Sequence, residues 1–288
     1  MKTIKVEDKD SGKKLITYLN KIYPDLKVNS IYKALRKKDI KINGKRINNN
    51  IVLGSGDIIE LYIQDSELEK NNYAVEKIYE DSNILIINKP CGIEVEGKNS
   101  VEELLEKEYE FIKPCHRIDR NTLGLVIFAK NLETLKFLLE KFKEGEIEKH
   151  YIAYVYGIPS KDEKTVNSYL FKDRKKSLVY ISNDRKKGYM PIKTSYKVLK
   201  KDVKNNICTL DVTLHTGRTH QIRAHLAYIG FPIIGDGKYG SYEVNKKFKK
   251  NSQMLCSYKI IFKFNNVDEE FKYLVGKEVV LNKIPIEL

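Results

Sequence analysis

A cluster of charged residues leads directly into an apolar run near the middle of the chain. His116, Arg117, Asp119 and Arg120 precede residues 125–129, LVIFA, whose β-branched and aromatic content is typical of a buried strand. A carboxylate at the mouth of such a strand loses hydration, and its charged form is then disfavoured unless a cation lies beside it. Asp119 is therefore a candidate catalytic carboxylate that needs a basic partner.

Arg223 is the candidate for that partner. Residues 219–229 have the pattern of a helix, and Arg223 shares a face with Ile222 and Leu226, which point toward a core. An arginine on an inward face needs a carboxylate, so we predict that Asp119 and Arg223 form a buried ion pair. The alternative, in which Asp119 caps a turn and Arg223 reaches solvent, stays open at this point.

Tyr151 is a second candidate for chemistry. Residues 147–157, IEKHYIAYVYG, alternate like a strand and put Tyr151, Ala153 and Val155 on one face. A tyrosine hydroxyl can handle a proton, although a tyrosine in a strand more often serves packing. Neither the five histidines nor the four cysteines have the spacing of a metal site, so we expect no metal site and reduced cysteines.

The apolar pattern divides the chain into two parts. Residues 1–64 read as two helices, at 10–22 and 30–38, followed by a hairpin at Asn43-Gly44 and a closing strand. Residues 65–77 are polar and read as a linker. The pattern of residues 78–288 predicts one α+β domain. The clearest elements are a helix at 131–145 and strands at 83–90, 147–157, 194–200 and 205–214. Residues 242–252 are predicted to form a basic loop.

Positive charge is concentrated at the amino-terminal end. The formal net charge is +14, and residues 1–64 carry 14 Lys and Arg against 7 Asp and Glu. Such a local excess favours a polyanion, with nucleic acid as the first candidate. The second helix would present a basic face with Lys33, Arg36, Lys37 and Lys38. The sequence has no membrane-length apolar run and no secretory signal, so we expect a cytoplasmic protein without membrane contact. We also expect a monomer.

Three longer motifs resemble those of the RluA family of pseudouridine synthases, and they occur in that family's order. They are HRIDRNTLGLVIFAK at 116–130, KHYIAYVYG at 149–157 and HTGRTHQIRAHLAYIGFPIIGDGKYG at 215–240. Residues 78–97 are similar to the family's opening strand and Lys-Pro-x-Gly turn, and the resemblance extends over about residues 78–264. Residues 1–64 resemble the RNA-binding module named after small ribosomal subunit protein S-four.

The resemblance implies a pseudouridine synthase fold, which is a mixed, largely antiparallel central sheet with flanking helices and an active-site cleft. A small N-terminal α/β RNA-binding module would precede it. The family pattern also assigns roles to individual residues. Asp119 matches the essential aspartate, Arg117 the arginine that takes the place of the flipped-out base, and Tyr151 the tyrosine that stacks on the uracil and abstracts its proton. Arg223 matches the basic partner of the aspartate, and Leu226 an apolar residue of the pocket.

His116, Lys149 and Arg218 lie inside the same motifs, and we expect them to bind substrate. Two residues depart from the family pattern: Leu123 stands where serine is commoner, and His150 separates Lys149 from Tyr151. Isomerising uridine needs no metal and no cofactor. We expect the target to be ribosomal RNA of the large subunit. A transfer RNA target and a non-catalytic RNA-binding role in ribosome assembly remain as alternatives.

Overall fold

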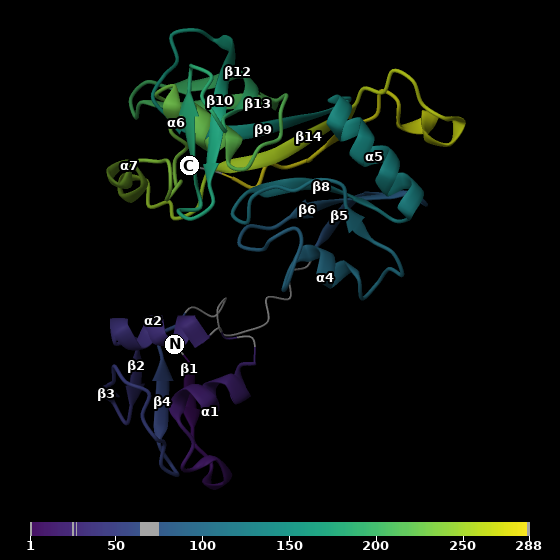
Figure 1. Ribbon diagram of the computed structural model, residues 1–288. Coiled ribbons are helices and arrows are strands. Elements are labelled where there is room, and N and C mark those ends of the chain that lie inside the picture. The colour runs from purple at the N-terminus through teal and green to yellow at the C-terminus, as the bar shows by residue number, and fades with distance from the viewer. Residues whose placement is uncertain (1, 25, 27, 64–74, 287–288) are drawn as a thin grey trace. The chain divides into compact units, whose positions relative to one another are not determined.

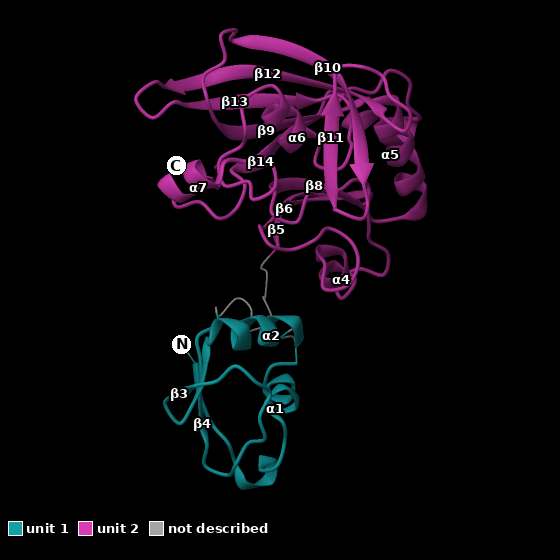
Figure 2. Cartoon of the chain, turned by 60° about the vertical axis from the view of Figure 1, so that its left-hand side comes forward, with its two compact units in different colours: residues 1–74 teal, residues 75–288 magenta. Residues whose placement is uncertain are grey.

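The computed structural model describes residues 2–24, 26, 28–63 and 75–286, and the chain divides into two compact units, Met1–Ala74 and Val75–Leu288 (Figure 2). Most of the linker expected at 65–77 lies outside the described residues. Its last two residues do not belong to a linker, because Glu76 and Lys77 begin strand β5. Their backbone pairs with β6, so a polar sequence at this point is the exposed edge of a sheet.

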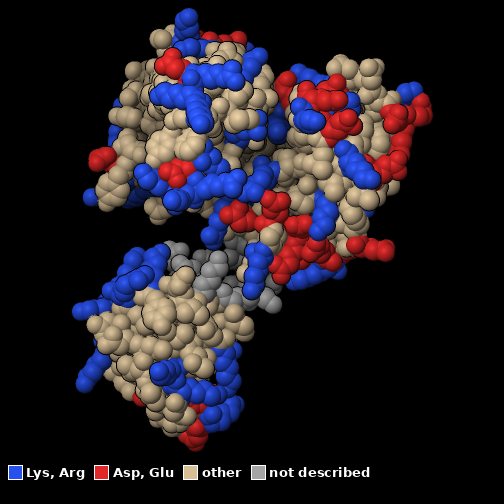
Figure 3. Space-filling model, viewed as in Figure 1, with Lys and Arg blue, Asp and Glu red and all other residues tan. Residues whose placement is uncertain are grey.

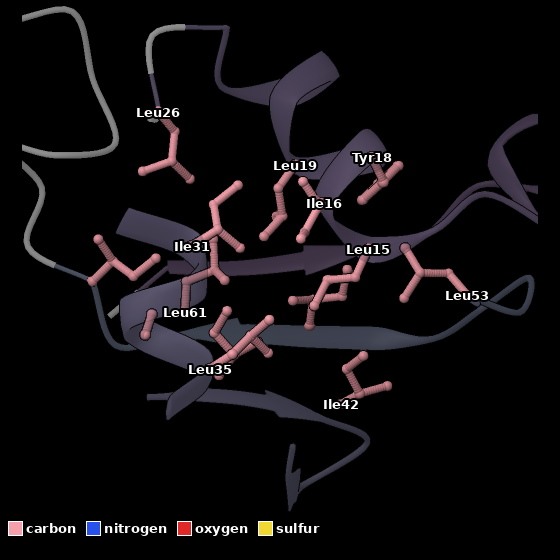
Figure 4. Close-up of a cluster of buried hydrophobic side chains, with 14 of the residues drawn as sticks. Leu15, Ile16, Tyr18, Leu19, Leu26, Ile31, Leu35, Ile42, Leu53 and Leu61 are labelled. Carbon is pink, nitrogen blue, oxygen red and sulfur yellow. The ribbon is translucent and has the colours of Figure 1, made fainter. Parts of the chain in front are cut away.

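The first unit is a four-stranded antiparallel sheet covered by two helices. The sheet order is β1-β4-β2-β3, and leucine and isoleucine side chains of the helices and strands share one core (Figure 4). Asn43 and Gly44 both have positive φ, as a two-residue hairpin turn requires, and they join β2 to β3 as predicted. The elements are β1 Lys2–Lys5, η1 Asp8–Asp10, α1 Leu15–Ile22, α2 Val28–Lys37, β2 Ile40–Ile42, β3 Lys45–Arg46 and β4 Ile58–Leu61.

The helix predicted at 10–22 begins later than expected. The backbone of Gly12 and Lys13 pairs with Leu53 and Lys14 is extended, so α1 starts only at Leu15. The second helix, α2, starts at Val28 rather than at residue 30. A long-range backbone pairing of this kind is invisible to a periodicity that is read along one segment.

The second unit is built on one large mixed sheet (Figure 1). Its main path runs β11-β10-β12-β13-β9-β14-β8-β6-β5, and every pair on that path is antiparallel except β14 with β8. The predicted α+β class with a largely antiparallel sheet is therefore confirmed. The strands are β5 Glu76–Glu80, β6 Ile84–Lys89, β7 Lys113–Pro114, β8 Leu123–Ala129, β9 Ile147–Tyr156, β10 Glu163–Asp173, β11 Leu178–Ser182, β12 Met190–Asp202, β13 Ile207–Leu214, β14 Leu255–Phe262 and β15 Glu278–Val280.

Few helices cover this sheet. They are α4 Val101–Leu105, α5 Leu132–Glu144, α6 Gln221–Tyr228 and α7 Tyr242–Lys247, together with the 3-10 turn η2 Glu269–Leu274. The signals that predicted α5 are present as expected: the Asn131 side chain accepts from the backbone of Thr134, and Gly145 ends the helix with a φ of 79°. Among the residues that the structure describes, no helix is long and apolar enough to cross a membrane.

Two predicted elements of the second unit need correction. The segment 242–252 is not wholly a loop, because the side chain of Ser241 caps the short helix α7. Helix α6 begins at Gln221 rather than at residue 219, since His220 has a left-handed φ of 52° that interrupts helical geometry. The side chain of Gln221 accepts hydrogen bonds from the Thr216 hydroxyl and the Arg218 backbone, which fixes the loop before the helix.

Candidate active site

A cleft of about 620 Å³ opens in the second unit, between the loop that enters β8 and the loop that enters α6. The end of α5 and the first half of β9 complete its walls. Seven of the predicted site residues line it, and these are His116, Arg117, Asp119, Lys149, Tyr151, Arg218 and Arg223. The structure therefore brings together residues from three motifs that are separated by up to about a hundred positions in sequence.

The predicted pair between Asp119 and Arg223 is confirmed. The Arg223 Nη1 group donates to Asp119 Oδ2 at 2.8 Å, and the arginine is only 7% exposed. The carboxylate is less buried, since the Asp119 side chain keeps 26% exposure toward the cleft. One oxygen of Asp119 is thus held by the arginine while the carboxylate still faces the space where a substrate can enter.

A second carboxylate, Asp236, holds the other side of the same guanidinium. Arg223 donates through Nε to Asp236 Oδ2 at 2.7 Å and through Nη2 to Asp236 Oδ1 at 2.9 Å. The Asp236 side chain is fully buried, and it also accepts from the backbone of Lys238 and Tyr239. Burial alone raises the pKa of Asp236, but Arg223 and these donors outweigh it and lower the pKa, so Asp236 is a permanent anion.

Tyr239 covers the guanidinium from one face. Its ring centroid lies 5.3 Å from the Arg223 Cζ atom. Its hydroxyl accepts from the Val179 backbone and also bonds His220 Nδ1, both at 2.9 Å. Because two hydrogen bonds anchor its hydroxyl, the ring helps to hold Arg223 in a single orientation toward Asp119.

A buried lysine supports the loop that carries Asp119. Lys89, at the end of β6, donates to the carbonyl oxygens of Pro90, Ile93 and Arg120 at 2.7 to 3.0 Å. Burial lowers the pKa of Lys89 to about 8. The Lys89 side chain ties the Lys-Pro-x-Gly turn to the residue after Asp119, so it positions the candidate catalytic carboxylate without touching the cleft.

Gly124 shows why a small residue must follow Leu123 where β8 begins. Its φ is +112°, and a Cβ atom at this position would lie 2.1 Å from the Ser257 carbonyl oxygen. The close approach joins β8 to β14 in the one parallel pair of the main sheet path. Leu123 itself pairs with Cys256 in that register, and its side chain is half-buried.

Tyr151 lies in β9 and is 4% exposed, at the edge of the cleft. Burial raises its pKa, and the nearby charge of Asp119 raises it further. The free protein therefore holds Tyr151 as a neutral phenol at neutral pH. A role as proton acceptor requires the hydroxyl to pass its own proton on as it receives another.

The remaining predicted residues differ in how they face the cleft. The Arg117 side chain is 67% exposed and donates to Glu96 at 2.6 Å on the rim. His116 and Lys149 both lie against the ring of Phe142. Leu226 needs correction, because it is buried one helical turn beyond Arg223 and does not line the cleft; Leu255 of β14 and Ile222 contribute the apolar lining there.

Sequence reasoning missed Asp236, Tyr239 and Lys89. Asp236 follows the apolar pair Ile233 and Ile234, so it too is a carboxylate at the end of a buried segment, the signal that selected Asp119. Nothing along the sequence indicates that both carboxylates meet one arginine. In the part of the chain that the structure describes, no three His, Cys, Asp or Glu side chains are grouped to hold a metal ion.

Comparisons with known proteins point to one enzyme family. The RNA pseudouridylate synthase family model matches residues 83–228. Proteins named ribosomal large subunit pseudouridine synthase C are 32% identical in Rickettsia bellii, with 94% of each chain covered, and 31% identical in Buchnera aphidicola, with 90% of this chain and 88% of that one covered. Val75–Leu288 is about three quarters of the chain, so these alignments extend into the first unit.

The fold is also found among solved structures. Human RNA pseudouridylate synthase domain containing 1 superposes with a TM-score of 0.59 at 19% identity, over 75% of this chain and 93% of that chain. Human RNA pseudouridylate synthase domain containing 4 superposes with a TM-score of 0.55 at 20% identity, over 68% of this chain and 90% of that chain. The chain belongs to the RluA-type family of RNA pseudouridine synthases.

Proposed function

We propose that the protein converts uridine to pseudouridine in ribosomal RNA of the large subunit, and that Asp119 carries the reaction. The observation that supports this most is the Asp119 carboxylate, which is held by Arg223 through one oxygen and remains open to the same cleft that Tyr151 lines. Relatives that share about a third of their residues over nearly the whole chain are named for the large ribosomal subunit.

The reaction breaks the bond between the sugar C1′ and uracil N1 and forms a bond between C1′ and C5. The C5 proton then leaves, and N1 gains a proton, so the change is an isomerisation without net gain or loss of atoms or electrons. Asp119, held by Arg223 through one oxygen, can attack the sugar or the base, or it can remove a proton from the sugar. Tyr151 borders the same space, so its ring can stack on the uracil and its hydroxyl can relay the C5 proton.

The uridine must leave its helical stack to reach Asp119, which costs a few kcal/mol. Arg117 is the side chain best placed to fill the gap that it leaves. It projects from the rim of the cleft, and its exposed contact with Glu96 is weak enough to exchange for RNA. His116, Lys149 and Arg218 line the walls and would contact the nucleotide or its neighbours.

The first unit supplies a separate RNA-binding surface in this proposal. Lys33, Arg36, Lys37 and Lys38 are exposed at the end of α2, and among the described residues none of the four forms an ion pair with a carboxylate. Residues 33, 36 and 37 fall on one helical face. Phosphate contacts from such a face give affinity with little sequence information. We expect the whole protein to act as a monomer in the cytoplasm.

Pseudouridine mapping of cellular RNA tests the proposal. Cells that lack the protein should lose the modification at one or a few uridines of large-subunit ribosomal RNA. The wild-type gene should restore them, and Asp119→Asn should not. Loss in transfer RNA instead would move the substrate to that class. Unchanged RNA in both classes would leave an RNA-binding role without catalysis.

A further inference from the structure

Lys149 is a cation in the cleft wall for which the described protein supplies no anion. It lies in β9 two residues before Tyr151, so both side chains leave the same face of the strand and both line the cleft. Two residues of a strand span about 7 Å. The Lys149 ammonium group lies 4.7 Å from the centre of the Phe142 ring, and no described carboxylate lies within ion-pair distance of it.

The acidic residues that line the cleft are already paired with other cations. Glu144 binds Lys141 at 2.9 Å. Glu148 binds His150 and Lys263, both at 2.7 Å. The charge of Lys149 is therefore not compensated by the groups that line the same wall.

His116, the other polar neighbour, does not supply an anion either. Its Nε2 atom accepts from the Ile127 backbone, so its proton lies on Nδ1, which has no acceptor among the described residues. Burial and the nearby charge of Lys149 lower the pKa of His116, so the imidazole is neutral. Two donors, Lys149 and His116, thus flank Phe142 without an acceptor.

The two buried cations near the cleft, Arg223 and Lys89, have hydrogen-bond partners, whereas the half-buried Lys149 has no anion. Arg223 has two carboxylates, and Lys89 has three carbonyl oxygens. Burying a cation without such partners destabilises a protein, and it lowers the pKa of Lys149 to about 8. A residue that costs stability in the free protein is best explained by a ligand that brings the missing anion.

The surroundings indicate what kind of anion this is. Lys143 and Arg218 also line the cleft, and among the described residues neither has a carboxylate partner. Figure 3 shows Lys and Arg side chains spread over the lobe that carries β10, β12 and α6, whereas Asp and Glu gather on the lobe with β5 and α4. An RNA strand that enters a positive cleft presents one phosphodiester per nucleotide.

We propose that Lys149 binds a phosphodiester group of the RNA strand inside the cleft, beside the nucleotide that stacks on Tyr151. The inference rests on the proposed function only in taking RNA as the occupant of the cleft. Lys149 would then fix the position of the RNA backbone relative to the stacked uracil. This contact would help to place the sugar over Asp119.

The test measures equilibrium binding in an inactive background, so that it does not depend on turnover. Asp119→Asn is combined with Lys149→Met, Lys149→Arg or Lys143→Met, and each protein is titrated with a short oligouridylate and with its uncharged methylphosphonate counterpart. Lys149→Met should weaken phosphodiester binding about tenfold or more, because it removes one desolvated, charge-assisted hydrogen bond. The parent and Lys149→Met should bind the methylphosphonate equally. Lys143→Met, an exposed lysine of the same cleft, is the matched control with a smaller effect.

The pH profile adds a readout that a packing role would not change. Only protonated Lys149 binds phosphate well, so parental affinity should fall as pH rises above about 8. Lys149→Arg should bind tightly without this fall, because a guanidinium stays charged. His116 and His215 have lowered pKa values and are already neutral in this range. Titration of the uracil itself is common to all variants.

Stability separates this role from a structural one. Lys149→Met removes a half-buried charge without an ion-pair partner and should raise the denaturation midpoint, whereas a structural lysine would lower it on replacement. The proposal is overturned if the parent does not bind the oligouridylate, if Lys149→Met binds it as the parent does, or if the difference persists with the methylphosphonate. Each of these results leaves the mapping of pseudouridine unaffected.

Discussion

Arg223 and Asp236 form a two-point ion pair that is completely enclosed, while Arg223 gives Asp119 only one hydrogen bond. The arginine is therefore oriented by the carboxylate that substrate cannot reach, and it presents a single N–H group to the carboxylate that substrate can reach. One positive charge is shared by two negative ones, so Asp119 has no tight two-point pair of its own.

This arrangement predicts that the same substitution lowers stability at Asp236 and activity at Asp119. Asp236→Asn should lower the free energy of unfolding by about 3–5 kcal/mol, because Arg223 loses its buried partner. Asp119→Asn should change stability little, since Asp119 is half-exposed and makes one bond, but it should abolish isomerisation while RNA binding persists. Urea denaturation and single-turnover assays of both variants check this. Near wild-type turnover by Asp119→Asn would rule out its role as the essential group.

Tyr151→Phe separates the ring from the hydroxyl. Phenylalanine keeps the stacking surface at a site that is 4% exposed, so RNA affinity should stay at the wild-type level. If the hydroxyl relays the C5 proton, the reaction should stall after the glycosidic bond has broken. Product analysis from single-turnover reactions detects that stage. The variant Tyr151→Leu also removes the ring, so it should bind RNA more weakly. Equal activity of Tyr151→Phe and wild type would reduce Tyr151 to packing.

The basic face of α2 should govern affinity rather than chemistry. Replacing Lys33, Arg36 and Lys37 together by Glu should weaken binding to structured RNA, and the removal of each phosphate interaction should reduce the salt slope by roughly 0.7–0.9. The apparent Michaelis constant should rise far more than the turnover number falls, because no residue of the cleft is changed. Binding and single-turnover rates at two salt concentrations measure both effects. A lower saturated rate with unchanged affinity would contradict the assignment.

His150 makes folding stability depend on pH. Burial alone lowers its pKa, but Asp211 at 3.1 Å and Glu148 at 2.7 Å outweigh it and raise the pKa above 6.5. The stabilisation is therefore complete below pH 6.5 and is lost as pH rises through the folded-state pKa. His116, His215, His220 and His225 have lowered pKa values and act in the opposite direction.

The difference between wild type and His150→Gln isolates this effect from the other histidines. Denaturation midpoints measured from about pH 6 to 8 should show an advantage of wild type at the acid end that shrinks toward the alkaline end. A constant difference across this range would mean that His150 is not charged in the folded protein.

Local signals were sufficient for the parts of the fold that depend on neighbours in sequence. The caps of α5 and the Asn43-Gly44 turn are where their residue types require them, because caps and tight turns are decided within a few residues. Predictions from the sequence were wrong where backbone distant in sequence sets the structure. Helix α1 starts late because Leu53 pairs with Lys13. Residues 76 and 77 pair with β6, and no local pattern in their own sequence predicts that pairing.

The sequence by itself selected the candidate residues for the chemistry. Charge next to an apolar run selected Asp119, and an arginine on an inward helical face selected Arg223, since burial makes each require the other. Only the tertiary structure decided how they are held. Asp236 and Leu255 come from chain that returns to the cleft after α6, and the lack of an anion at Lys149 depends on where Glu144 and Glu148 find their own partners. Periodicity specifies which face a side chain leaves, but it does not specify what meets it there.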